Sequence, residues 1–231
     1  PGIVALVARK GKIVYHKAFG TSDAETKRKL QKDDIFRLAS QSKAITATAV
    51  MMLWEEGKFQ LDDPISKYIP EFKNPKVLDS VLADGTYLTK PADKEISIRH
   101  LLTHTSGIGY GVIDSDARIK KIYKDAGIID LFTTKKITIA ANIKKLAVLP
   151  LHHNPGEKFT YSESYDVLGY FIEIVSGMPF DRYLRTHIFE PLEMSNTGFY
   201  LPKSKENRLV AVQTNAAGKW TNYPTTFYDP K

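Results

Sequence analysis

Ser40 and Lys43 lie three residues apart in the stretch 36–45, at the start of an apolar-patterned segment that ends near Gly57. If a helix begins at Ser40, positions i and i+3 share one face, so the hydroxyl and the amine meet one turn apart. A serine hydroxyl is a poor nucleophile, and a neighbouring amine activates it by taking its proton or by stabilising the group that does. The unpaired N–H groups of a helix N-terminus can also hold an oxyanion. The pair is therefore a candidate for the chemistry of Ser-x-x-Lys hydrolases.

By itself this motif is weak evidence. The chain is rich in lysine, so one Ser-x-x-Lys is expected by chance, and the motif at Ser40 is the only one present. Short motifs carry a false-positive risk that only their context removes. Motifs elsewhere in the chain have to distinguish a chance occurrence of Ser-x-x-Lys from a catalytic pair.

Tyr161 is the second candidate. It follows the Pro155-Gly156 turn and precedes a predicted helix, which places it on a positioned loop. A tyrosine with a reference pKa of about 10 acts as a base only when a cation is near, and Lys43 is the candidate for that cation. Taken alone, a tyrosine before a helix more often serves packing.

Other chemistries find little support. His100 and His104 are four residues apart, but no glutamate follows His100, so the zinc-protease pattern fails. The adjacent His152 and His153 lack further ligands, and the glycines of 107–111 do not complete a dinucleotide fingerprint. There is no Gly-x-Ser-x-Gly elbow, and the absence of cysteine excludes a thiol nucleophile and disulfides. We expect neither a metal nor a cofactor.

Asp62 and Asp63 form a carboxylate pair that a metal or acid–base site could use. They precede Pro64, however, and aspartate and proline are both favoured where a helix begins. Helix capping is therefore the preferred interpretation.

Composition limits the class of protein. The 231 residues suffice for one large domain or two packed ones, and no apolar run reaches the roughly 18 residues that a membrane helix needs. The net charge of +7 comes mostly from lysine, including pairs in helical segments that we interpret as solvated faces rather than nucleic-acid contacts: Lys120-Lys121, Lys135-Lys136 and Lys144-Lys145. A basic surface can still favour anionic substrates. The compartment stays open, with a periplasmic or secreted location favoured slightly over a cytoplasmic one.

Periodicity predicts the elements that position these residues. A hairpin over 3–8 and 12–19 comes first, then a polar loop and the helix that starts near Ser40. A short helix over 61–69 and an irregular excursion over 74–93 follow. Further helices are predicted at 97–104, 114–130, 138–147, 164–175 and 180–188, before an irregular tail over 201–231. Strands followed by helices favour an α+β arrangement.

Together these stretches resemble the serine β-lactamase superfamily, most closely its class C branch with the related carboxylesterases and D-alanyl-D-alanine peptidases. The likeness rests on pieces in a specific order: Val4 to Arg9 with Gly11-Lys12, Phe36 through Ser40 to Lys43, Leu61 to Pro64, Arg99 to Gly107, Pro155-Gly156 to Tyr161-Ser162, and Phe189 to Leu192. The resemblance implies that Ser40 is the acylated nucleophile, Lys43 its proton partner and Tyr161 the base.

The resemblance also implies a β-lactamase/transpeptidase-like α+β fold. Residues 1–36 would supply part of an antiparallel sheet, and 37–200 a mostly helical domain that carries both motifs. Residues 201–231 would form an irregular segment returning toward the sheet.

Two departures from the family pattern stand out. Glu163 occupies the third position of the tyrosine motif, where β-lactamases and peptidases usually carry asparagine; the run from Tyr161 to Gly169 looks more like the esterase-like members. The third family motif, a Lys-Thr-Gly or His-x-Gly on a late strand, is absent from the sequence. A two-stranded hairpin cannot bury its own apolar face, so its partner strands are also missing. We therefore expect a fragment, inactive alone, that lacks the C-terminal part of the sheet and an N-terminal helix.

The resulting hypothesis is a serine acyl hydrolase that works through an acyl-serine intermediate. Its substrates would be small esters, β-lactams or D-amino-acid peptides, with ester or amide hydrolysis favoured over efficient β-lactamase activity. The alternative is a non-catalytic binding or scaffold protein that retains the fold. The sequence determines neither the natural substrate nor the oligomeric state.

Overall fold

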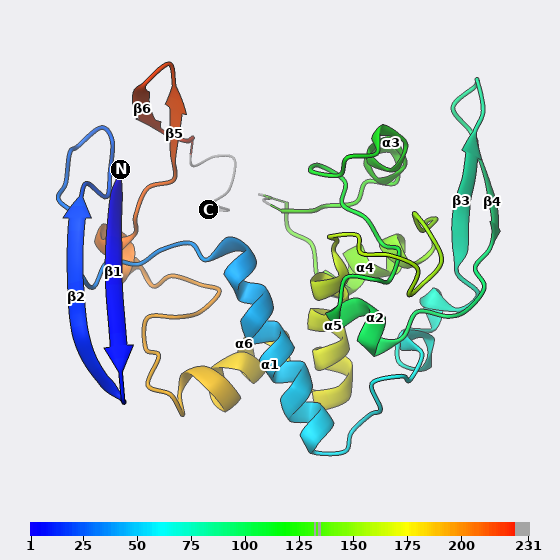
Figure 1. Cartoon of the computed structure of the whole chain (residues 1–231), viewed down its shortest axis with the longest axis horizontal. Helices are drawn as coiled ribbons and strands as arrows, with labels where there is room; N and C mark the ends of the chain where they lie inside the picture. The colour runs from blue at the N-terminus through cyan, green and yellow to red at the C-terminus, as the bar shows by residue number, and fades with distance from the viewer. Residues whose placement is uncertain (132, 134, 225–231) are drawn as a thin grey trace. The chain divides into compact units, whose positions relative to one another are not determined.

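The computed structural model describes residues 1–131, 133 and 135–224. The chain divides into two compact units, whose described parts are residues 1–40 with 195–224 and residues 41–194. Figure 1 labels the helices and strands of both. No described helix has the length and apolar character needed to cross a membrane.

The first unit begins with the predicted hairpin, which is confirmed. Strand β1 (Gly2–Arg9) pairs antiparallel with β2 (Lys12–Gly20), in a register that sets Arg9 opposite Lys12. Lys10 and Gly11 between the strands both have positive φ, at 50° and 72°. Two positive φ values are what a two-residue type I′ turn requires, so the Lys-Gly dipeptide sets the register of the hairpin.

Residues 203–222 differ from the irregular tail that the sequence predicted. They form the 3-10 helix η5 (Lys203–Arg208) and a second hairpin of β5 (Gln213–Ala216) and β6 (Lys219–Asn222). The expectation was wrong because these strands have four residues each, too few to show a periodicity. Residues 225–231 of the predicted tail lie outside the described residues.

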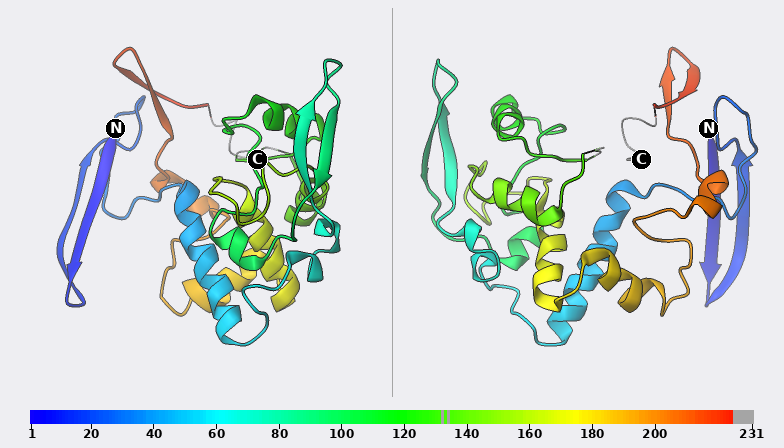
Figure 2. Two further views of the ribbon diagram at one scale, coloured as in Figure 1. Left: turned by 45° about the vertical axis from the view of Figure 1, so that its right-hand side comes forward. Right: turned by 180° about the vertical axis from the view of Figure 1, so that it is seen from behind.

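The second unit contains the hydrophobic core and is built around α5 (Ser164–Ser176). Four helices pack against α5: α1 (Ser42–Glu55), α2 (Ile98–Leu102), α4 (Ile139–Ala147) and α6 (Phe180–Leu184). The views of Figure 2 show α1 beside α5. Phe171 of α5 is fully buried and makes edge-to-face contacts with Phe59 and Tyr68, at centroid distances of 5.0 and 4.9 Å. Large apolar side chains from distant segments thus meet on one central helix.

Residues 74–93, predicted as an irregular excursion, instead contain a hairpin of β3 (Lys76–Val81) and β4 (Tyr87–Pro91). Backbone bonds also tie β3 to Leu151, whose N–H donates to the Lys76 carbonyl while its own carbonyl accepts the Leu78 N–H. The proline and glycine residues of this segment indicated an irregular loop. In the structure they lie at the ends and the turn of the hairpin, where they are compatible with two short strands.

Helix α3 (Ala117–Asp125) is shorter than the predicted 114–130. Asp116 caps it by accepting the Arg118 N–H at 2.9 Å. The carboxylates of Asp114 and Asp130, predicted as helical, instead accept N–H groups from the loop before the helix. Short polar side chains compete for backbone donors in this way, and here the two aspartates lie outside the helix at either end.

Candidate active site

Ser40 lies in a short 3-10 helix, η1 (Ala39–Gln41), immediately before α1. Lys43 is the second residue of α1, three positions after Ser40. The helix predicted to start at Ser40 is therefore present, with a tighter first turn. The pair occupies the helix start on which its proposed chemistry depends.

The Lys43 ammonium group is surrounded by tyrosine rings. Its Nζ lies 4.8 Å from the ring centroid of Tyr161, 5.8 Å from that of Tyr110 and 6.0 Å from that of Tyr165. Nζ also donates a hydrogen bond to the Tyr110 hydroxyl at 3.2 Å. A cation within about 6 Å of a ring is attracted by its face. The structure thus brings Lys43 and Tyr161 together, although they lie 118 positions apart in the sequence.

The three tyrosines differ in their ability to act as a base. Tyr110 is buried, and burial together with the nearby carboxylates raises its pKa far above the usual value, so it keeps its proton. The Tyr165 hydroxyl donates to the Leu102 carbonyl at 3.0 Å, and burial raises the pKa of Tyr165 as well. Tyr161 is 38% exposed, so its phenol is accessible to a substrate. Of the tyrosines around Lys43, Tyr161 is the best placed to exchange a proton.

Tyr110 is a site residue that the sequence analysis missed. Its loop is held by side chains: the Tyr110 N–H donates to Asp114 at 3.0 Å, and the N–H groups of Gly111 and Val112 donate to Asp130 at 2.8 and 2.7 Å. A Cβ atom at Gly109 would lie only 2.5 Å from Asp114 Oδ2 and 2.6 Å from His152 Nε2, so a larger residue there would displace these two side chains. The signal was the Gly-Tyr-Gly sequence at 109–111, to which the sequence analysis gave no catalytic role.

Glu163, the departure from the family pattern, is 1% exposed at the N-terminal boundary of α5. Neither of its carboxyl oxygens has a hydrogen-bond partner among the described residues. Burial and, to a smaller extent, the nearby carboxyl groups of Asp166 and Asp130 together raise the pKa of Glu163 to about 9. Glu163 is therefore a buried, neutral carboxylic acid near pH 7.

We predict that Glu163→Gln changes the pH dependence of stability. The folded-state pKa of about 9 exceeds the usual 4.5, so the folded state keeps a proton that the unfolded state loses. Stability should fall as pH rises from about 4.5 to 9. Each pKa unit corresponds to about 1.4 kcal/mol, and 1 kcal/mol moves Tm by about 2–4 °C in a chain of this size.

Thermal unfolding of both proteins from pH 5 to 8 measures this effect. The Tm of Glu163→Gln, relative to the unaltered protein, should rise by several degrees across that range. Parallel curves for the two proteins would show that Glu163 ionises normally.

A cavity of about 510 Å³ adjoins the tyrosines. Tyr110 and Tyr161 line it together with the apolar side chains of Ile113 and Phe159, which are 52% and 66% exposed. Its polar residues include Asp114 and His152, which form a hydrogen-bonded pair at 2.8 Å, and Lys158. A mixed surface of this kind can receive the apolar part of a substrate next to the candidate base.

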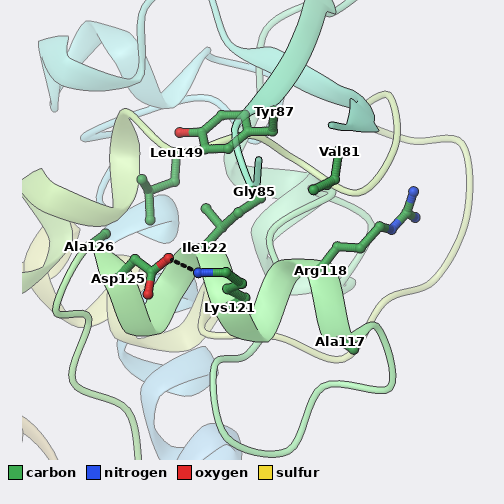
Figure 3. Close-up of a pocket in the computed structure, with 10 residues that line it drawn as sticks. All are labelled: Val81, Gly85, Tyr87, Ala117, Arg118, Lys121, Ile122, Asp125, Ala126 and Leu149. Carbon is green, nitrogen blue, oxygen red and sulfur yellow. Dashed lines mark hydrogen bonds and ion pairs between the residues drawn. The ribbon is translucent and has the colours of Figure 1, made fainter. Parts of the chain in front are cut away.

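A second cavity, of about 430 Å³, lies between α3 and the β3–β4 hairpin (Figure 3). Tyr87, Ile122 and Leu149 contribute apolar surface, and Lys121 is paired with Asp125 at 2.6 Å. None of Ser40, Lys43 and Tyr161 lines this cavity.

The polar clusters that the sequence analysis set aside have structural partners. Asp62 forms an ion pair with Arg99 at 2.7 Å, and Asp63 accepts the Gln60 N–H at 3.0 Å. His100 Nδ1 accepts the Ser97 N–H and completes the capping box of α2. Within the described residues, no group of three or more His, Cys, Asp or Glu side chains is arranged to hold a metal ion.

Comparison with known proteins identifies the family. The Beta-lactamase family model matches residues 1–227, so the chain belongs to the Beta-lactamase family. It has the β-lactamase/transpeptidase-like α+β fold, as predicted. The chain is 37% identical over 198 residues to Esterase EstB of Burkholderia gladioli, covering 86% of this chain and 47% of that protein.

Solved structures agree with this assignment. EstCE1, described as a hydrolase with promiscuous acyltransferase activity, matches with a TM-score of 0.81 and 34% identity, covering 96% of this chain and 54% of that one. Simvastatin synthase (LovD) of Aspergillus terreus matches with a TM-score of 0.77 and 25% identity, covering 96% and 55%. The chain spans about half the length of the curated relatives it matches.

Proposed function

We propose that the protein is a serine acyl hydrolase that cleaves esters through an acyl-Ser40 intermediate. The observation that carries the proposal is the position of the Lys43 ammonium 4.8 Å from the Tyr161 ring, with Tyr161 exposed and Tyr110 and Tyr165 unsuited as bases. A cation favours the phenolate form of a nearby tyrosine. Membership in the Beta-lactamase family and the likeness to an esterase support the same chemistry.

The proposed reaction has two acyl-transfer steps. Tyr161 takes the hydroxyl proton of Ser40 while Oγ attacks the ester carbonyl, and the alcohol leaves with a proton returned by Tyr161. A water molecule then loses a proton to Tyr161 and attacks the acyl carbonyl; the bond to Ser40 Oγ breaks as Tyr161 returns the proton to Oγ, which releases the acid and restores Ser40. Lys43 stabilises the negative charge of Tyr161 each time the phenol gives up its proton.

The cavity beside Tyr161 supports an ester with an apolar group. Ile113 and Phe159 present apolar surface at this cavity, while Asp114 is already engaged by the Tyr110 N–H and by His152. An apolar group there gains about 25 cal/mol for each Å² removed from water. Short-chain esters therefore suit the site better than a charged peptide.

A labelling and turnover experiment tests this function in the full-length protein. We expect a fluorophosphonate probe to label it, and p-nitrophenyl butyrate to be hydrolysed faster than nitrocefin or a D-alanyl-D-alanine peptide. Faster turnover of nitrocefin would contradict the ester assignment. A protein that neither binds the probe covalently nor turns over any of these compounds would instead support the scaffold alternative. The observation that favours this alternative is the buried Glu163 in the tyrosine motif.

A further inference from the structure

His104 contacts three consecutive residues centred on Tyr161. Its carbonyl oxygen accepts the Thr160 N–H at 2.7 Å, and its Nδ1 accepts the Ser162 N–H at 3.2 Å. Its ring lies 4.8 Å from the Tyr161 ring, tilted by 42°. His104 is only 8% exposed, so these contacts are shielded from water. A single residue thus holds the backbone on both sides of Tyr161 and one face of its ring.

The backbone at His104 indicates that the side chain is needed. His104 follows Thr103, the C-cap of α2, and has a φ of +54°. Glycine is the usual residue at this position because it adopts positive φ without strain. Histidine is tolerated there better than most side chains, but it still costs more than glycine. The contacts that its imidazole makes to Tyr161 and Ser162 offset that strain.

The Ser162 N–H and a buried chain of hydroxyl groups lie against Nδ1 of the ring. Nδ1 accepts the Ser162 N–H, so it carries a lone pair, and a neutral ring then has its proton on Nε2. Ser162 Oγ lies 3.2 Å from Nδ1 and 2.7 Å from Ser164 Oγ, and Ser164 Oγ lies 2.9 Å from Ser106 Oγ. All three serines are fully buried, so the polar contacts on this side of the ring are closed to water.

The charged neighbour of the ring favours the same neutral form. Burial and, to a smaller extent, the positive charge of Lys43 on α1 together lower the pKa of His104 to about 4. The other titratable groups against the ring are the phenols of Tyr161 and Tyr165, which carry no positive charge. His104 thus remains an acceptor throughout the neutral pH range.

We infer that His104 is the positioning residue of Tyr161: its neutral imidazole and its carbonyl hold the base against Lys43. The inference rests on the proposed function, because Tyr161 is a base only in that reaction. It also gives a role to His104 within the stretch from Arg99 to Gly107, which the proposed function alone leaves without one. A displacement of about 1 Å at a reacting group can cost about 10²-fold in rate.

Two substitutions in the full-length protein test the inference. His104→Phe keeps an aromatic ring and removes the acceptor, and kcat for p-nitrophenyl butyrate should fall about 10²-fold with little change in KM. His104→Asn places an oxygen near the position of Nδ1 and tolerates positive φ, so it should keep kcat within about tenfold of the unaltered protein. His100→Asn is the matched control, because it replaces the other histidine of this segment, whose bonds to Ser97 cap α2.

Amide hydrogen exchange at Ser162 supplies a readout that does not depend on activity. Protection of the Ser162 N–H should be lost in His104→Phe and kept in His104→Asn and His100→Asn. If protection is lost while kcat is unchanged, the contact is only structural and the inference is wrong. If the unaltered protein has no Ser40-dependent turnover, the proposed function fails, whatever the exchange shows. Equal kcat losses in His104→Phe and His100→Asn would also overturn the inference, because they would reflect general destabilisation.

Discussion

Ser40→Ala is expected to abolish ester hydrolysis by the full-length protein, with a loss of about 10⁴-fold or more. Removing the nucleophile of a serine hydrolase leaves only the rate that binding and oxyanion stabilisation supply. The fold should change little, because Ser40 lies in the short helix η1 ahead of α1, and a serine-to-alanine change at a helix start costs about 0.5–2 kcal/mol. The measurements are steady-state rates with p-nitrophenyl butyrate and thermal unfolding of the same samples.

Ser42→Ala is the matched control for this substitution. Ser42 is the first residue of α1 and is exposed, so the change removes a serine hydroxyl two positions away from Ser40. Its rate should stay within a few-fold of the unaltered protein. Equal losses in Ser40→Ala and Ser42→Ala would mean that the helix start, and not one nucleophile, governs the rate.

Tyr161→Phe is expected to lower kcat by about 10²–10⁴-fold, the usual contribution of a positioned general base. The ring remains available for the contacts with Lys43 and His104, so the loss reports the phenol oxygen alone. Because groups that act as one unit are not additive, Lys43→Met combined with Tyr161→Phe should be little worse than either change alone. Additive losses in the double variant would show that Lys43 and Tyr161 act separately.

Tyr165→Phe is the control for the phenol itself. Its hydroxyl donates to the Leu102 carbonyl, so its removal should cost stability of about 1 kcal/mol and less than tenfold in rate. A larger rate loss in Tyr165→Phe than in Tyr161→Phe would show that the base is Tyr165 and not Tyr161.

Local sequence was enough to predict the helix that carries Lys43, because Ser-x-x-Lys and the apolar stripe of α1 lie within one element. The resemblance supplied Tyr161 by its motif, and the structure brings its ring to Lys43. The role of Tyr110 could not be predicted, because Asp114 and Asp130 hold its loop through hydrogen bonds from backbone N–H groups to their carboxylates. Such bonds leave no periodic pattern in the sequence.

Other features depend on tertiary contacts that a single sequence does not display. Glu163 was recognised as a departure, but its burial and raised pKa follow from packing around the start of α5. His104 lay within the Arg99 to Gly107 piece of the resemblance but had no role assigned to it, because its bonds reach Thr160 and Ser162, far along the chain. The β3–β4 hairpin was missed because its turn and end residues obscured two short strands.

Trapping of the acyl intermediate tests the central claim most directly. The full-length protein is mixed with p-nitrophenyl butyrate, quenched with acid within the first turnover, digested and analysed by peptide mass spectrometry. We predict one butyryl group on Ser40, no such adduct in Ser40→Ala, and a smaller fraction acylated at the same time in Tyr161→Phe. A butyryl group on another residue, or turnover without any acylated peptide, would contradict the account.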